Sequence, residues 1–301
     1  MTPARHGSVA TAGRPGLVWA APVLLFFGLF ALLPMGAVVY LSLTEYSGIG
    51  TPAWLGGDHW ARLLDDPIFF DSLWKSAALT ALSWLFQTAI ALPLGVFIAA
   101  PGRSRALLAA IFFMPLLLSG AAIALLWTTL FDPNFGLASV VGPWIGVEDG
   151  NFIGSPTLAF YCILLVVSWQ FMPFHTLLYQ AATRQIPHTL YEAATIDGAG
   201  RWRQFRSVTL PQLRDTLITS SVLIVVGSLT YFEVILIITG GGPGTATRIL
   251  PLHMYLEGFR SFDMGYASAL AVVLLALGAA LSLLVTRVTG YHRMASQREG
   301  L

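Results

Sequence analysis

Six long apolar runs constrain how this chain can fold more than any other feature. They cover residues 17–43, 76–101, 106–131, 156–179, 216–238 and 264–286, and Glu233 in the fifth run is the only charged residue among them. A helix needs about 20 apolar residues to cross a bilayer, whereas barrel strands alternate polar and apolar residues over about ten positions. We therefore predict an all-α membrane protein with six transmembrane helices.

The composition excludes several other classes of protein. Charged residues make up 10% of the chain, whereas about 25% is usual in a soluble domain. The net charge of +1 offers no basic surface for nucleic acid. The single cysteine, Cys162, excludes a disulfide framework and any multi-cysteine metal site. The spans contain no HExxH motif and no paired carboxylates, so we expect no metal site and no enzyme active site.

The distribution of basic residues predicts the orientation. Of the 16 lysines and arginines, 12 lie in the N-tail, the 101–106 and 180–215 connections and residues 287–301. Basic connections stay in the cytoplasm, so both termini are expected there. The first run exceeds the 7–15 residues of a signal-peptide core, and we expect a retained helix. The predicted parts are a cytoplasmic N-tail (1–16), the first helix with an external loop (17–75), a core (76–288) and a cytoplasmic C-tail (289–301).

The connection 180–215 has helical periodicity of its own. LYEAATI predicts one short helix, Gly198 a turn, and residues 201–208 a second helix. Its apolar residues predict an apolar face that can contact another surface. These residues are Leu190, Ala193, Ala194, Phe205 and Val208. Such a hairpin either lies on lipid headgroups or docks to a cytoplasmic partner.

The chain cannot carry a standard ATP site. A P-loop requires GxxxxGK[ST], and the only lysine, Lys75, lies in LWKS without a glycine. Any ATP hydrolysis must therefore come from another polypeptide.

Several motifs in this sequence are similar to those of one transporter family. Glu192-Ala193-Ala194, Asp197-Gly198-Ala199, Phe205 and Leu210-Pro211 resemble the EAA loop of permease subunits of ABC importers. The segments 232–233, 239–243, 255–259 and 262–269 resemble the carbohydrate-uptake branch, in particular its maltose- or glycerol-phosphate-type permease. The resemblance covers essentially the whole chain.

This resemblance implies a type I ABC importer transmembrane domain in the cell membrane of a prokaryote. It also implies four kinds of partner: a second homologous permease, two copies of a P-loop ATPase, an external solute-binding protein and a small-molecule solute. ATP and Mg²⁺ would bind to the ATPase, with no cofactor in this chain. The residues implied in coupling to the ATPase are Glu192, Ala193, Ala194, Asp197, Gly198, Ala199, Phe205 and Pro211.

Polar and aromatic residues in the fourth and fifth runs suggest a substrate pathway. An ionisable residue inside a span is a candidate functional residue, although Glu233 lies close enough to the end of its run to reach the external interface. Sugars are bound by aromatic faces together with hydroxyl or amide groups, but each aromatic residue could equally pack inside the bundle. The candidate pathway residues are Ser168, Trp169, Phe174, Ser228, Tyr231 and Glu233.

Together these features predict a permease subunit that translocates a sugar, an oligosaccharide or a sugar-like solute. One alternative is the same architecture with a glycerophosphodiester or another polar solute. Another is a stand-alone secondary transporter or channel, which would show internal repeats and charged relay residues. The loops around 45–75, 132–155 and 240–262 are expected to meet the binding protein.

Overall fold

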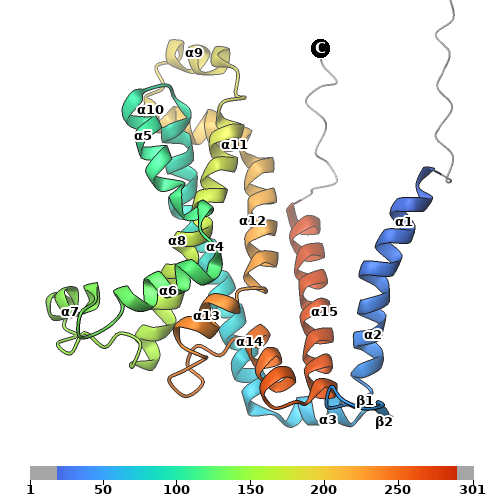
Figure 1. Ribbon diagram of the computed structural model, residues 1–301. Helices are drawn as coiled ribbons and strands as arrows, with labels where there is room; N and C mark the ends of the chain where they lie inside the picture. Colours follow the sequence, from blue (N-terminus) through green and yellow to red (C-terminus); the bar gives the residue numbers. More distant parts are fainter. Residues whose placement is uncertain (1–18, 290–301) are drawn as a thin grey trace, which may run out of the picture.

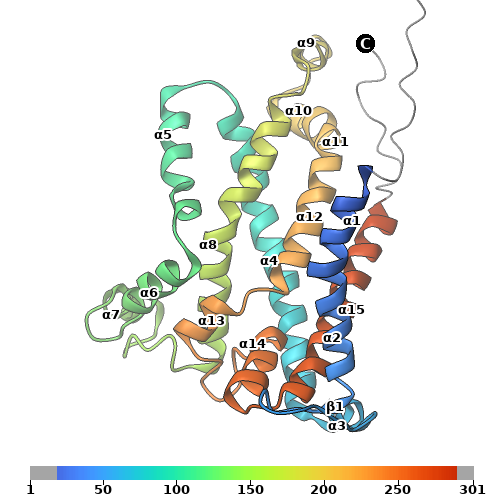
Figure 2. The ribbon, with the colours of Figure 1, turned by 45° about the vertical axis from the view of Figure 1, so that its right-hand side comes forward.

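A computed structural model describes residues 19–289, which form an open bundle of helices (Figures 1 and 2). The predicted N-tail, and the predicted C-tail apart from residue 289, lie outside this part of the chain. Four helical segments within it are long and apolar enough to cross a membrane. They correspond to the first, second, fourth and sixth apolar runs, and the prediction of a spanning helix is confirmed for each of these.

The bounds of these four segments follow the apolar runs closely. The first consists of α1 (Ala21–Phe27), a π-helical turn η2 (Gly28–Leu32) and α2 (Leu33–Leu41). The others are α4 (Pro67–Ala99), α8 (Pro156–Thr183) and α15 (Met264–Thr289). The first segment packs along α15 and has no buried residue, so it leaves most of its apolar surface open.

The prediction of a continuous helix is wrong for the third run, 106–131. That run forms α5 (Arg103–Phe112), a 3₁₀ turn η3 (Met114–Leu117) and α6 (Gly120–Leu130). Pro115 lies inside the turn, where it cannot donate a backbone hydrogen bond. Ser119 then caps a new helix, because its hydroxyl accepts from the backbone N of Ala122 at 3.2 Å.

The prediction is also wrong for the fifth run, 216–238. It forms α12 (Arg214–Ser228) and α13 (Glu233–Ile238) with a turn between them. In that turn the backbone N of Thr230 donates to the carbonyl of Gly227 at 2.9 Å, and the Thr230 hydroxyl donates to the same carbonyl at 2.7 Å. Local hydroxyl bonds of this kind compete with the helical ladder, so the helix ends there.

The tight contact between α4 and α8 organises the bundle. Gly95 makes this contact possible: a Cβ at this position would lie 2.7 Å from Cβ of Tyr179 and 2.8 Å from the carbonyl oxygen of Thr176. α12 packs against α4 and α15, and α13 packs against α6. The main hydrophobic core lies where α4, α6, α8 and α13 meet, and it includes Leu79, Ile123, Val167 and Ile235.

Short elements gather at one end of the bundle, at the bottom of Figure 1. They are the antiparallel strands β1 (Thr44–Glu45) and β2 (Ala53–Trp54), α3 (Asp58–Asp65), α14 (Leu250–Tyr255) and a π-helical turn η6 (Leu256–Arg260). To one side lie α7 (Leu137–Val141) and a 3₁₀ turn η4 (Gly142–Ile145).

Asp66 ties this end together. Its carboxylate caps α4 by accepting from the backbone N of Ile68 at 2.8 Å, accepts the Tyr266 hydroxyl at 2.6 Å, and lies 3.3 Å from Nε2 of His253. Burial raises the pKa of Asp66, but the bonds from Tyr266, Ile68 and His253 together bring it below its ordinary value. The segment before α4 is thus joined to α14 and α15.

Candidate coupling and translocation sites

The connection 180–215 forms a helical hairpin at the opposite end of the bundle (Figure 1). Its elements are α9 (His188–Ile196), α10 (Arg201–Gln204), a π-helical turn η5 (Phe205–Thr209) and α11 (Leu210–Gln212). Both short helices expected from the sequence are present. We refer to residues 188–212 as the coupling hairpin.

The turn expected at Gly198 is also confirmed. Gly198 has φ +73°, a conformation that strains any residue with a Cβ. The backbone N of Ala199 donates to the carbonyl of Ala194 at 2.8 Å and thereby closes α9. A glycine at this position sets the direction in which the chain leaves α9.

Side-chain bonds hold the two arms of the hairpin together. Nε2 of Gln204 donates to the carbonyl of Ala199 at 2.9 Å and to the hydroxyl of Thr195 at 3.0 Å. The hydroxyls of Tyr191 and Thr209 lie 2.9 Å apart. Gln204, Tyr191 and Thr209 were not singled out from the sequence, since only the fold brings these positions into contact.

The surface of the hairpin is polar around Glu192 and apolar at its tip. Glu192, Ala193, Asp197, Gly198 and Pro211 are exposed, while Ala194, Ala199 and Phe205 are half-buried. Ile196 is 87% exposed and Trp202 is 73% exposed, and the Trp202 ring stacks on Phe205 with centroids 5.6 Å apart. Large apolar side chains with this exposure indicate a contact surface for another molecule. The sequence reasoning missed Ile196 and Trp202.

At mid-height in the bundle, the two interrupted runs meet. A Cβ at Gly120 would lie 2.7 Å from Oε2 of Glu233 and 3.7 Å from Nε2 of Gln170. Gly120 begins α6 and Glu233 begins α13, so the carboxylate lies beside the first turns of two helices. The partial positive charge of a helix N-terminus favours a negative charge at such a place. Gly120 was missed, because nothing in the apolar run 106–131 marks the break before it.

An aromatic surface adjoins this carboxylate. Tyr231 stacks on Phe171 with ring centroids 4.7 Å apart and planes at 17°. Phe174 lies about one helical turn from both Gln170 and Phe171 on α8, and it is 40% exposed. Of the predicted pathway residues, Phe174 and Glu233 are exposed, whereas Tyr231 is buried in the main hydrophobic core. We group Gly120, Gln170, Phe171, Phe174, Tyr231 and Glu233 as a candidate pathway and refer to it as the translocation surface.

The other three predicted pathway residues lie elsewhere. Ser168 is buried. Ser228 is also buried, and its hydroxyl lies 2.6 Å from that of Thr80 on α4. Trp169 packs edge-on against Trp127 of α6, with centroids 5.6 Å apart. These contacts give Ser228 and Trp169 a packing role in the bundle.

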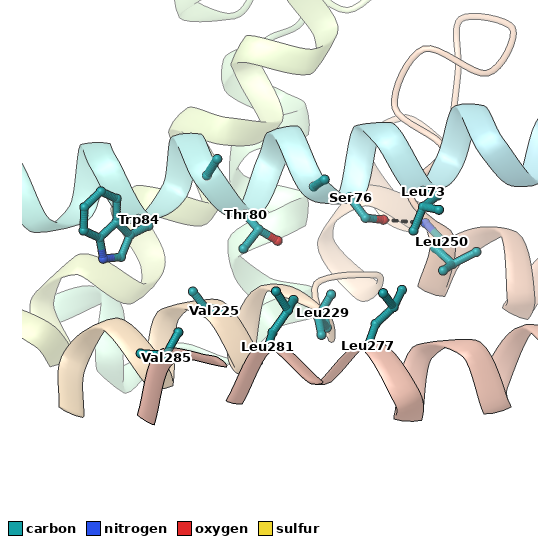
Figure 3. A pocket seen from close by; sticks show the side chains of 12 residues that line it. Leu73, Ser76, Thr80, Trp84, Val225, Leu229, Leu250, Leu277, Leu281 and Val285 are labelled. Carbon is teal, nitrogen blue, oxygen red and sulfur yellow. Dashed lines mark hydrogen bonds between the residues drawn. The ribbon is translucent and has the colours of Figure 1, made fainter. Parts of the chain in front are cut away.

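A separate apolar groove of about 390 Å³ lies between α4, α12 and α15 (Figure 3). Its few polar atoms already have partners: the hydroxyl of Ser76 accepts from the backbone N of Leu250 at 2.8 Å, and Nε1 of Trp84 donates to Ser221 at 2.8 Å. A groove with so little free polarity suits hydrocarbon better than a sugar. Among residues 19–289, no group of three potential metal ligands comes together.

Comparisons with known proteins agree with this arrangement. The model of the family described as "Binding-protein-dependent transport system inner membrane component" matches residues 91–290. Diacetylchitobiose uptake system permease protein NgcF of Streptomyces coelicolor is 31% identical, over 92% of this chain and 83% of its own length. Trehalose/maltose transport system permease protein MalF of Thermococcus litoralis is 29% identical, over 92% and 94%.

The fold is also that of a solved transporter. A chain of a bacterial alginate ABC transporter, solved in complex with an alginate pentasaccharide-bound periplasmic protein, superposes with a TM-score of 0.80 at 23% identity, over 93% of this chain and 96% of that one. This agreement shows a common fold. The family match and the identity to NgcF show that this chain belongs to the inner-membrane permease components of binding-protein-dependent ABC importers.

Proposed function

We propose that this permease carries a sugar or oligosaccharide along the translocation surface. The observation that carries the proposal is the meeting of two interrupted helices at Gly120 and Glu233 beside stacked aromatic rings. Interrupted helices commonly form transporter binding sites, because their ends offer unpaired backbone groups inside the membrane. Aromatic faces next to a carboxylate and an amide match the apolar faces and hydroxyls of a sugar.

The named cargoes of the relatives support a carbohydrate. Diacetylchitobiose, trehalose or maltose, and alginate are named for the three proteins above. The exposed carboxylate of Glu233 would repel a phosphodiester, and it would equally repel an acidic saccharide such as alginate. A neutral saccharide, as in the first two relatives, therefore fits this surface better than either anion. We infer that the exposed residues of the translocation surface contact the saccharide during passage.

The proposed topology has six crossings, two of them through the interrupted helices α5–α6 and α12–α13. The end that carries the coupling hairpin would be cytoplasmic, as would both termini. The segment 17–75 would supply the first crossing and an external loop, and 76–288 the core. A second permease would face the translocation surface, and a solute-binding protein would dock at the end that carries α3 and α14.

The coupling hairpin would transmit ATP hydrolysis from two ATPase subunits. Its exposed tip offers apolar contact through Ile196 and Trp202, and Glu192 offers a charge beside it. Gly198 sets the geometry between α9 and α10. Closure of the ATPase pair would push the hairpin and move the attached helices as a rigid body. ATP and Mg²⁺ would bind to the ATPase and not to this chain.

Transport in proteoliposomes tests this proposal. The permease pair, the ATPase and the binding protein are reconstituted, and ATP-dependent uptake of labelled disaccharides is measured. Gly198→Leu and Glu192→Lys should abolish uptake while the permease still folds and the binding protein still binds the sugar. Gly200→Ala is the control, because Gly200 has φ −68° and nothing within 4 Å of an added Cβ. Normal uptake by both variants would refute the coupling role.

A further inference from the structure

A pocket of about 500 Å³ lies between the coupling hairpin and the ends of α4 and α8. Its wall is apolar on the side of α4, and its basic residues come from the end of α8 and from the hairpin. It is separate from the translocation surface, with which it shares no residue. The residues that line it are Val96, Ala99, Ala100, Pro101, Thr183, Arg184, Ile186, His188, Tyr191, Arg201, Gln204, Phe205 and Thr209.

The positive charge in this pocket is not neutralised by the residues that line it. Arg184 and Arg201 both line it, and no aspartate or glutamate does. Within residues 19–289, neither arginine forms an ion pair with a carboxylate. Nε of Arg184 donates to the carbonyl of Ala99 at 3.1 Å, which holds the guanidinium at the end of α4 and leaves its other two nitrogens for a ligand.

The other polar side chains of the pocket are already occupied. The hydroxyls of Tyr191 and Thr209 bond to each other, and Gln204 bonds to Ala199 and Thr195 within the hairpin. The hydroxyl of Thr183 donates to the carbonyl of Tyr179 at 2.7 Å. The groups left to recognise a ligand are therefore the two guanidinium groups and the ring of His188, which favour an anion with several acceptor oxygens.

The position of the pocket along the membrane-spanning helices indicates the kind of anion. α4 ends at Ala99 and α8 ends at Thr183, and both residues line the pocket. A site at the ends of two membrane-spanning helices lies at headgroup level, and its apolar wall at Val96 and Ala100 continues toward the hydrocarbon. Basic pockets between helices on the cytoplasmic side bind acidic lipid headgroups.

We propose that this pocket binds the phosphate headgroup of an acidic phospholipid of the inner leaflet, such as phosphatidylglycerol. The inference rests on the proposed function for its orientation, since that places the coupling hairpin in the cytoplasm. The bound phosphate would connect Arg201 of the hairpin to Arg184 at the end of α8. Acidic lipid would therefore stiffen the junction through which the hairpin moves the helices.

Native mass spectrometry of the purified permease pair tests this directly. Phosphatidylglycerol is titrated against the wild type, the Arg184→Gln/Arg201→Gln variant and the single Arg201→Gln variant, which leaves the bond to Ala99 intact. We expect the double variant to bind the lipid about 30-fold more weakly at one site, and the single variant about fivefold more weakly. Arg206→Gln is the control, because it removes the same charge from an exposed position outside the pocket.

Two further arms distinguish other occupants. Phosphatidylcholine should bind the wild type and the double variant equally, and inorganic phosphate should not displace phosphatidylglycerol. The inference is overturned if the double variant binds phosphatidylglycerol as tightly as Arg206→Gln does. It is also overturned if the double variant binds the ATPase more weakly while its lipid binding is unchanged. Because lipid binding is measured without transport, this failure is distinct from a failure of the proposed function.

Discussion

Gly95 is the position where a single methyl group should force two membrane-spanning helices apart. The Cβ of Gly95→Ala would lie 2.7 Å from Cβ of Tyr179, 2.8 Å from the carbonyl oxygen of Thr176 and 3.1 Å from the backbone N of Gln180. Two of these atoms are backbone and the third is attached to it, so no side-chain rotation relieves the contact. Since carbon atoms pack at about 3.5–4.0 Å, α4 and α8 would have to separate by about 1 Å.

That separation would weaken the whole interface between the two helices. A gap of this size forfeits about a quarter to a half of the dispersion energy of each contact, and it would lengthen the bond from Nε2 of Gln180 to the carbonyl of Ile98, now 3.2 Å. Overpacking of a core costs about 1–3 kcal/mol. Because the contacted atoms belong to the backbone, we expect Gly95→Ala to lie near 3 kcal/mol.

Thermal unfolding of the purified full chain in detergent measures this loss. Cys162 is the only cysteine, so a thiol-reactive fluorophore reports its exposure as the chain unfolds. Gly36→Ala is the matched control, because Gly36 also lies within a membrane helix but has nothing within 4 Å of an added Cβ. Gly95→Ala should lower the Tm by several degrees and Gly36→Ala should leave it at the wild-type value or above. Equal Tm values would refute the argument from helix contact.

Two further predictions concern the translocation surface and the external end. Gly120→Val should displace the carboxylate of Glu233, which lies 2.7 Å from the Cβ position, and so lower the rate of sugar uptake at least tenfold without loss of folding. Gly227→Ala, whose nearest contact is an ordinary 3.8 Å, should transport normally, and equal uptake by the two variants would contradict the prediction. The lowered pKa of Asp66 means that this carboxylate stabilises the fold at neutral pH, and that its contribution is lost as the pH falls through the folded-state pKa. The Tm of Asp66→Asn should therefore be lower than that of the wild type at neutral pH and should decline less on acidification, whereas parallel Tm–pH profiles would rule out this role.

Much of the fold was predictable because lipid imposes a simple demand on sequence. A long apolar run in lipid has to satisfy its own backbone, which favours a helix, and four of the six runs each form one long helical segment. The coupling hairpin was also predictable, since its short helices and the turn at Gly198 depend on local preferences. The hydrogen bonds of Gln204 and Tyr191 that join its two arms were not predictable, because they connect positions separated by a turn.

The two interrupted runs show where hydropathy fails. The break before Gly120 and the break before Glu233 both lie in sequence that is apolar enough to continue a helix. Hydropathy measures the free energy of transferring a segment from water into lipid. That free energy is similar for one continuous helix and for two shorter helices whose ends are buried against neighbouring helices. Ser119 and Thr230 supply local caps, but whether a cap prevails depends on the packing around it.

The candidate pathway divides in the same way. The sequence identified the polar and aromatic residues of two runs, and of these Phe174 and Glu233 are exposed, whereas Tyr231 and Ser168 are buried. Ser228 and Trp169 are equally polar or aromatic, yet Ser228 contacts α4 and Trp169 packs against α6. The chemistry of each side chain could be inferred from the sequence. The direction in which each side chain points depends on which helices lie beside α8.

The sequence by itself determined that this chain lies in a membrane, that it contains no P-loop for ATP hydrolysis, and that the connection 180–215 forms a helical hairpin. These properties follow from composition, from a missing motif and from local helix and turn preferences. Only the tertiary structure decided where two of the apolar runs break, which side chains share the translocation surface, and that Arg184 and Arg201 line one pocket. Those features depend on contacts between residues far apart in the chain, and the energies of such contacts are set by packing geometry that no single segment contains.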